Sequence, residues 1–109
     1  DRRETAPPPH ELRRYDTIRY MQFEWDRDKA RKNLKKHKVS FDEAVTVFYD
    51  SLSATFYDPD HSADEDRFIT VGYSSRGRLL VVSHAERVKT IRIISARPAT
   101  AHERKRHES

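Results

Sequence analysis

Cysteine is absent from this chain of 109 residues, and only two glycines are present. The first absence excludes disulfides and thiolate metal sites, and it fits a reducing cytosol. The second excludes a glycine-rich phosphate-binding loop. No apolar run reaches the roughly 18 residues that a membrane span needs, and the first residues lack the apolar stretch of a signal peptide. These absences favour a soluble, cytoplasmic protein.

Charged residues outnumber hydrophobic ones, at 37% against 35% of the chain, so we expect a small core under a highly charged surface. The length is that of one domain. Lysine and arginine total 22, aspartate and glutamate total 18, and the net charge is +4. This basic balance permits a polyanionic partner such as nucleic acid, although charge alone is weak evidence for one.

Residues 1–20 differ from the rest of the chain in having three consecutive prolines, many charges and no apolar periodicity. The proline run favours polyproline II, which has no internal hydrogen bonds. We interpret this segment as a disordered or non-native leader, and Met21, the only methionine, as the natural start. Residues 21–109 are then expected to form a single domain.

Strand-forming residues dominate the stretch from 67 to 97. Three runs rich in Val, Ile, Leu, Phe and Tyr are separated by short polar breaks. Connections this short join antiparallel neighbours, because a parallel crossover needs a dozen or more residues. We therefore predict an antiparallel meander, entered by a fourth strand over 52–57. Residues 22–25 alternate polar and apolar side chains and are compatible with another short strand.

Two helix start signals precede this meander in the sequence. Asp26 is a good N-cap for a basic helix over 27–37. Ser40 and Glu43 fit a capping box, in which the hydroxyl accepts from the N3 amide and the carboxylate reaches back to the N-cap amide. The helix that follows should end near residues 49–50, and its apolar stripe should pack on the sheet: Phe41, Ala44, Val45 and Phe48.

A further capping box, formed by Thr100 and Glu103, precedes a short and very basic C-terminal helix. Taken together, these signals predict an α+β fold. It consists of a small antiparallel meander, two N-terminal helices packed on it, and the C-terminal helix.

Strand pairing predicts which polar side chains meet. If Tyr73 lies opposite Arg78, then Arg67 and His84 face each other on one side of the sheet. A carboxylate, from Glu65 or Glu86, would lie near this pair. If the second hairpin keeps the same alternation of side chains, Arg97 would join this face at its opposite end. A slip of one residue would undo the arrangement.

Histidine, arginine and glutamate on a basic surface suit RNA cleavage without a metal. A base takes the proton of the ribose 2′-hydroxyl, an arginine stabilises the phosphorane, and an acid protonates the departing 5′-oxygen. The candidate catalytic residues are therefore Arg67, His84, Arg97 and Glu65. In the alternative interpretation, His84 only caps a strand and Arg67 pairs with loop carboxylates.

Further basic side chains are candidates for RNA contacts: Lys35, Lys36, Arg76, Arg104 and Lys105. A charged helix surface is equally compatible with plain solvation. The acidic loop over 58–66 contains His61, but its spacing matches no standard metal-ligand pattern, and turn formation explains its Asp and Pro residues. We expect no metal and no cofactor.

Three segments resemble the BrnT family of bacterial type II toxins: FEWDRDKARKNLKKHKVSFDEAVTVFYD, DPDHSADEDRFITVGYSSRGRLLVVSHAER and RIISARPATAHERKRHE. The resemblance runs from about Met21 to the C-terminus. Its strong positions here are Trp25, Arg67, Phe68 and Arg97, and His84 lies in an HxxR segment that similar members share. The resemblance implies a RelE-like fold and a ribonuclease that inhibits translation.

The same resemblance implies a partner antitoxin, BrnA, that neutralises the toxin. In such systems the complex usually represses its own operon, with DNA contacts made mainly by the antitoxin. The residues alone leave a different class of function open, a non-enzymatic module that binds nucleic acid or protein through its basic helices. Incubation of the protein with RNA in EDTA separates the two, because only the first hypothesis predicts cleavage.

Overall fold

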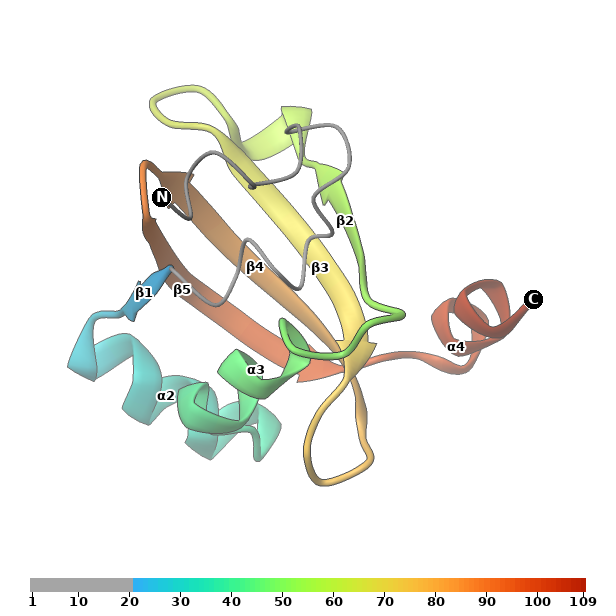
Figure 1. Cartoon of the computed structure of the whole chain (residues 1–109). Helices are drawn as coiled ribbons and strands as arrows, with labels where there is room; N and C mark the ends of the chain where they lie inside the picture. The colour runs from blue at the N-terminus through green and yellow to red at the C-terminus, as the bar shows by residue number, and fades with distance from the viewer. Residues whose placement is uncertain (1–20) are drawn as a thin grey trace, which may run out of the picture.

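The computed structural model describes residues 21–109, and within them one five-stranded sheet has the strand order β1-β5-β4-β3-β2 (Figure 1). Its strands are β1 (Gln22–Glu24), β2 (Ala54–Tyr57), β3 (Arg67–Tyr73), β4 (Leu79–Arg87) and β5 (Thr90–Pro98). Strands β2 to β5 form the predicted antiparallel meander. The predicted short strand over 22–25 is β1, and it adds to the meander by pairing parallel to β5. The two helices between β1 and the meander make a connection long enough to permit this.

Within residues 21–109, three α-helices accompany the sheet: α2 (Arg27–His37), α3 (Phe41–Val47) and α4 (Ala101–Glu108), with a 3-10 turn η3 (Pro59–His61). Asp26 caps α2 as predicted, accepting from the backbone amide of Lys29 at 3.0 Å. Helix α3 ends at Val47, two or three residues earlier than expected. Beyond it, the Asp50 carboxylate accepts from the Leu52 and Tyr73 amides at 3.0 and 2.8 Å, so the chain turns there towards the sheet.

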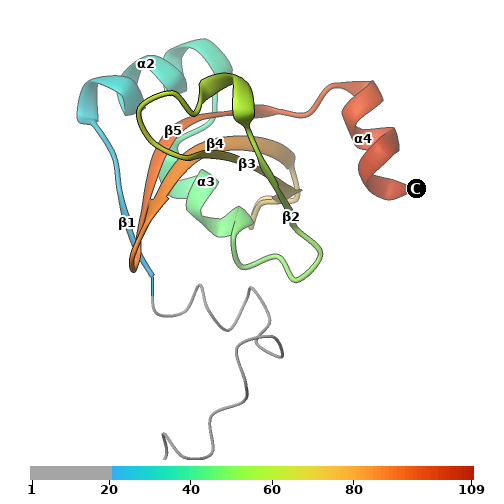
Figure 2. The same cartoon turned by 90° about the horizontal axis from the view of Figure 1, so that it is seen from above.

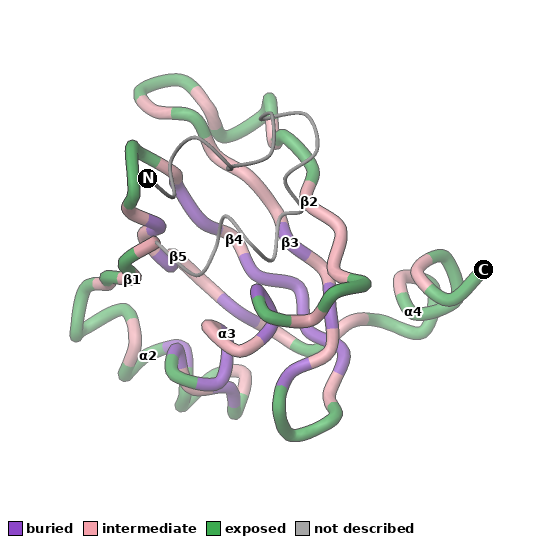
Figure 3. The backbone as a smooth tube through the Cα atoms, in the orientation of Figure 1, coloured by how far each residue is buried: buried purple, intermediate pink, exposed green. Residues whose placement is uncertain are grey.

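Helices α2 and α3 pack against the sheet, and α4 projects beyond the strand ends (Figure 2). The core lies between α3 and the central strands, where buried residues concentrate on β4 and β5 (Figure 3). Asn33 fastens α2 to this layer, because its side-chain amide donates to Val39 O at 2.9 Å and Ala96 O at 2.8 Å and accepts from Ala96 N at 3.0 Å. The core cluster contains Val39, Phe41, Ala44, Val47, Phe48, Leu80, Val82, Ile91, Ile93 and Ala96.

The β3–β4 hairpin is one residue out of the predicted register. Tyr73 lies opposite Leu79 and not opposite Arg78. Ser74 donates its amide to Arg78 O at 2.8 Å, and Gly77 adopts a left-handed φ of 76°, so the loop includes Arg78. Only glycine takes this conformation without a steric cost. Since side chains alternate with period two, the slip exchanges the faces of every residue on β4 relative to β3.

A β-bulge in β5 places the two arginines of this strand, Arg92 and Arg97, on the same face of the sheet. Ser83 lies opposite Ser95 while His84 lies opposite Ile93, so Ile94 is an additional residue on β5. Arg92 and Arg97 are five positions apart and would lie on opposite faces of a regular strand. The bulge reverses the parity between them. Both therefore lie on the sheet face opposite α3, together with Arg67. We call it the arginine face.

Candidate functional site

At one end of the arginine face, a single carboxylate holds several guanidinium groups. Glu65 accepts from Arg67 Nε at 3.1 Å and from Arg92 Nη2, and Arg87 Nη2 lies 3.8 Å from its other oxygen. The hydrogen bond from Arg92 is the main cause of a lowered pKa for the Glu65 carboxyl. Three positive groups around one negative group leave an excess of positive charge that remains partly open to solvent. Such a cluster favours an anionic ligand.

Arg97 and Glu103 form a two-point ion pair farther along the same face. Arg97 Nη1 and Nη2 donate to the two oxygens of Glu103, each at 2.8 Å. These bonds are the main reason that the pKa of Glu103 falls to about 2, and they raise the pKa of Arg97. The Arg97 side chain is still 40% exposed. A guanidinium fork of this geometry binds carboxylate and phosphate alike.

A groove of about 380 Å³ lies beside this ion pair, between the sheet and α4. Its floor is apolar and comes from β2, β3 and β4, whereas its polar and charged rim comes from β5 and α4. The lining residues are Phe56, Ile69, Val71, Val81, Arg97, Glu103, Arg106 and His107. Sequence reasoning proposed Arg97 among these residues. It missed Phe56, Arg106 and His107 as site residues, although the period of two along β2 and β3 was a usable signal for the floor.

Helix α4 forms one wall of the groove through a few specific contacts. The Tyr73 hydroxyl donates to Glu108, which raises the pKa of Tyr73, and the Tyr73 ring lies 6.1 Å from the His107 ring. The predicted capping box at its start is present, with Glu103 N donating to Thr100 Oγ1 at 3.1 Å and Thr100 N donating to Glu103 at 2.8 Å. Glu103 therefore both starts the helix and binds Arg97.

His84 lies on the other face of the sheet, so the predicted pairing of Arg67 with His84 is wrong. The register slip places Phe68 opposite His84, and the imidazole is fully buried. Its Nε2 lies 2.7 Å from Thr70 Oγ1, its Nδ1 lies 3.3 Å from a Glu86 oxygen, and Phe48 packs edge-on at 4.9 Å. In this position His84 cannot touch a ligand on the arginine face. The imidazole that lines the groove is His107.

The predicted RNA-contacting residues are exposed but do not converge on the groove. Lys35 and Lys36 lie in the last turn of α2, and Arg76 lies at the tip of the β3–β4 hairpin. Arg104 and Lys105 belong to α4, the helix that supplies one groove wall. The five residues therefore divide into one group near α2 and the hairpin and another on α4.

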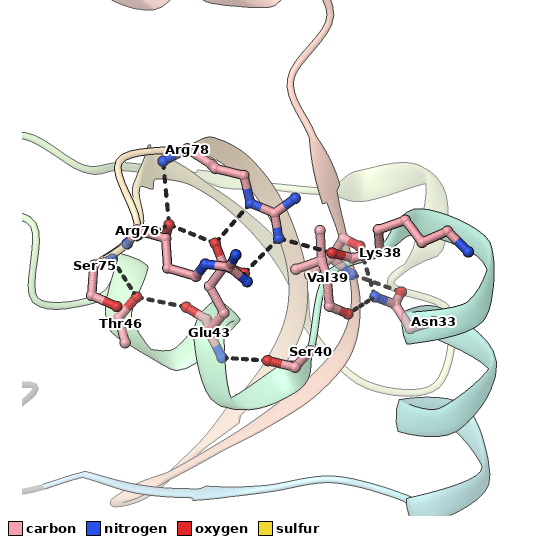
Figure 4. Close-up of polar contacts among 11 residues, drawn as sticks. Asn33, Lys38, Val39, Ser40, Glu43, Thr46, Ser75, Arg76 and Arg78 are labelled. Atoms are coloured by element: carbon pink, nitrogen blue, oxygen red, sulfur yellow. Dashed lines mark hydrogen bonds and ion pairs between the residues drawn. The ribbon is translucent and has the colours of Figure 1, made fainter.

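Glu43 joins the β3–β4 hairpin to α3 (Figure 4). Of the reciprocal capping box predicted for Ser40 and Glu43, only one hydrogen bond is present. Ser40 Oγ accepts from Glu43 N at 3.0 Å as expected. The carboxylate, however, accepts from Ser74 Oγ at 2.7 Å and from Arg78 Nε at 3.0 Å. The guanidinium of Arg78 also donates to Lys38 O at 2.8 Å. A buried carboxylate gains more from this cation than from one backbone amide, so Glu43 turns away from the N-cap.

Among residues 21–109, no group of three or more His, Asp or Glu side chains is placed to hold a metal ion. In the acidic loop, His61 Nδ1 lies 2.8 Å from an Asp58 oxygen, so this pair is accounted for by the turn itself. Across the same residues, none of the helices is long and apolar enough to cross a membrane.

Comparison with known proteins adds two findings. A family model described as "Ribonuclease toxin, BrnT, of type II toxin-antitoxin system" matches residues 25–103. The 1.1 Å crystal structure of the Brucella abortus ribonuclease toxin BrnT has a similar fold, with a TM-score of 0.55 and 22% sequence identity. The similarity covers 73% of this chain and 97% of that one. No curated protein matches the chain.

Proposed function

Since this chain belongs to the BrnT family of ribonuclease toxins from type II toxin–antitoxin systems, we propose that it is an endoribonuclease that cleaves RNA on the arginine face. The observation that carries the proposal is the bulge at Ile94, which brings Arg92 and Arg97 onto the same face as Arg67. Without it, the cationic groups of β5 would be divided between the two sides of the sheet. We also assign the fold to the RelE-like class.

The proposed reaction needs no metal. The ribose 2′-oxygen attacks the adjacent phosphate, the 5′-oxygen leaves, and a cyclic phosphate is formed. Arg97 stabilises the additional negative charge of the phosphorane through the N–H groups that do not donate to Glu103. His107 transfers the proton in this scheme, since its imidazole lines the groove with Arg97. It accepts the proton of the 2′-hydroxyl and then donates a proton to the departing 5′-oxygen. It takes the role that sequence reasoning had assigned to His84.

Glu65 and Glu103 act as positioning residues in this proposal. Each carboxylate holds an arginine side chain in one orientation, Arg67 by Glu65 and Arg97 by Glu103. An oriented guanidinium loses less conformational freedom when it meets the reacting phosphate. The exposed part of each arginine remains available to the substrate.

The test is cleavage of RNA by the purified protein in EDTA. Discrete products are expected, and Arg67→Ala and Arg97→Ala should each lower the rate roughly a hundredfold or more, as for loss of one preorganised charge donor. Arg67→Lys should restore only part of the rate, because an ammonium lacks the planar fork. Arg31→Ala is the matched control, since Arg31 is exposed on α2, where it pairs with Asp28.

Normal cleavage by both folded alanine variants would place the site elsewhere. Binding of RNA without cleavage by the unaltered protein would favour the second candidate, a non-enzymatic nucleic-acid- or protein-binding module. The exposed Lys35, Lys36 and Arg76 are the observation that favours this alternative, because they are cationic side chains that do not line the groove.

The proposed toxin is cytoplasmic, inhibits translation, and is neutralised by a BrnA-like antitoxin that covers the arginine face. A cationic face is the natural docking surface for an acidic partner segment, and occupancy alone would exclude RNA. Operator DNA would be contacted only through the complex with the antitoxin. The strand β2, at the edge of the described sheet, offers a second docking position, since an edge strand accepts an added strand.

Competition tests this partner proposal. A non-cleavable RNA and the antitoxin should not bind at the same time, and the affinity for the antitoxin should fall as salt rises. A stable ternary complex of toxin, antitoxin and RNA would show that the antitoxin acts from another surface.

A further inference from the structure

Phe56 is a large apolar side chain that the fold leaves open beside cationic groups. It lies on β2 opposite Ile69, so its ring belongs to the arginine face and reaches the groove. More than half of it, 56%, is exposed. The next residue, Tyr57, points to the other side and packs against Phe68 at 5.6 Å. The exposure of Phe56 therefore follows from the alternation of β2, at a position that lines the groove.

The order of rows across the arginine face places this ring between two cationic sites. One row contains Arg67 and Arg92, and another contains Val71 and Arg97. The row of Phe56 lies between them. Along β3 the two arginine rows are four residues apart, which corresponds to about 13 Å at about 3.3 Å per residue. A polyanion crossing the face meets positive charge, then an apolar floor with an aromatic ring, and then positive charge again.

We infer that this face binds an unpaired segment of RNA, with phosphates at the two arginine rows and one base stacked on Phe56. The inference deepens the proposed function and rests on it for the identity of the ligand. Unpaired bases stack on aromatic side chains whatever their sequence. A duplex keeps its bases stacked inside and presents sugars and phosphates, so it gains nothing from an apolar floor. The groove thus selects single-stranded RNA, and Phe56 positions that RNA by stacking on one of its bases.

The experiment compares two ligands of one sequence, a 2′-O-methylated single strand and the same strand annealed to its complement. The methyl groups prevent cleavage, so binding is measured alone. The unaltered protein should bind the single strand at least tenfold more tightly. Phe56→Ala should remove most of this preference, a loss of roughly tenfold or more for one stacked base, and Phe56→Trp should retain it.

Leu52→Ala is the matched control, because Leu52 is a still more exposed apolar residue, at 76%, that does not line the groove. It should leave the ratio of the two affinities unchanged, whereas Arg97→Ala should weaken both ligands. Thermal unfolding of Phe56→Ala should resemble that of the unaltered protein, because the ring is mostly exposed.

Equal binding of duplex and single strand by the unaltered protein would overturn the inference, and so would an unchanged ratio in Phe56→Ala. Weakened binding of the antitoxin by Phe56→Ala, with RNA binding intact, would assign the ring to a protein interface and would also overturn it. The two proposals fail differently. If Phe56→Ala cleaves RNA as fast as the unaltered protein, only this inference is refuted. If the unaltered protein binds single strands selectively but does not cleave them, only the proposed ribonuclease activity is refuted.

Discussion

Replacement of Glu43 by alanine should weaken the whole fold, because its carboxylate joins α3 to the β3–β4 hairpin. The side chain is 4% exposed and accepts hydrogen bonds from Ser74 and from both Nε and Nη2 of Arg78. Removing one partner of a fully buried ion pair costs about 3–5 kcal/mol. Arg78 is one-third exposed, so water compensates part of the loss. We expect Glu43→Ala to lower the free energy of unfolding by about 2–3 kcal/mol.

Urea denaturation at pH 7 measures this difference. Asp42→Ala is the matched control, since Asp42 is an exposed acid in the same helical turn and its loss removes only a helix-dipole interaction of about 0.3–1 kcal/mol. Ser74→Ala removes one of the bonds to Glu43 and should cost about 1 kcal/mol. If Glu43→Ala is no more destabilising than Asp42→Ala, the buried ion pair does not hold the hairpin to α3.

The same contact predicts a pH dependence. Arg78 is the main cause of the lowered pKa of the Glu43 carboxyl. A carboxyl with a pKa below its unfolded value contributes stability above that value and loses it as the pH falls through the folded pKa. The stability difference between the unaltered protein and Glu43→Gln should therefore shrink on acidification below pH 4.5. A difference that is constant with pH would contradict this assignment.

The remaining predictions concern other parts of the fold. Ser40→Ala should cost about 1 kcal/mol in urea denaturation, the usual range for an N-cap, with RNA cleavage unchanged. Gly72→Ala should lower the melting temperature and cost about 1–3 kcal/mol by overpacking, because the added methyl would come within 2.8 Å of Ser53 Cβ. The carboxyl of Glu103 should titrate near pH 2 in an NMR experiment, so its ion pair should persist below pH 4.5 and break only as the pH falls through about 2. Its contribution to stability should be complete above 4.5 and decline between these two values. Deletion of residues 1–20, which lie outside the described residues, should change the melting temperature little.

Features that depend on neighbouring residues could be predicted from the sequence by itself. Asp26 and Thr100 mark the starts of α2 and α4, because an N-cap acts on backbone amides two or three residues away. The antiparallel meander followed in the same way from connections too short for a parallel crossover. The resemblance to the BrnT family, drawn from the residues quoted for it, is confirmed by the family match over 25–103.

Glu43 shows where such local reasoning stops. The spacing from Ser40 correctly predicted one hydrogen bond of a capping box. The direction of the carboxylate was decided by Arg78, which is 35 positions away in the sequence and adjacent only in the folded chain. Competition between a local amide and a distant cation depends on tertiary packing, so no pattern within one helix predicts its outcome.

The composition of the arginine face was likewise decided by the tertiary structure. The sequence contained every residue of the site, but a strand pattern determines only which residues alternate, and the face that each set occupies depends on pairing. Because the β3–β4 loop around Gly77 is longer by one residue than predicted, His84 and Arg67 lie on opposite faces of the sheet. Because the bulge adds one residue at Ile94, Arg92 and Arg97 lie on the same face. The sequence by itself therefore determined the elements and the family. Only the paired sheet decided which side chains share a surface, because each single-residue shift reverses the parity of the side chains beyond it.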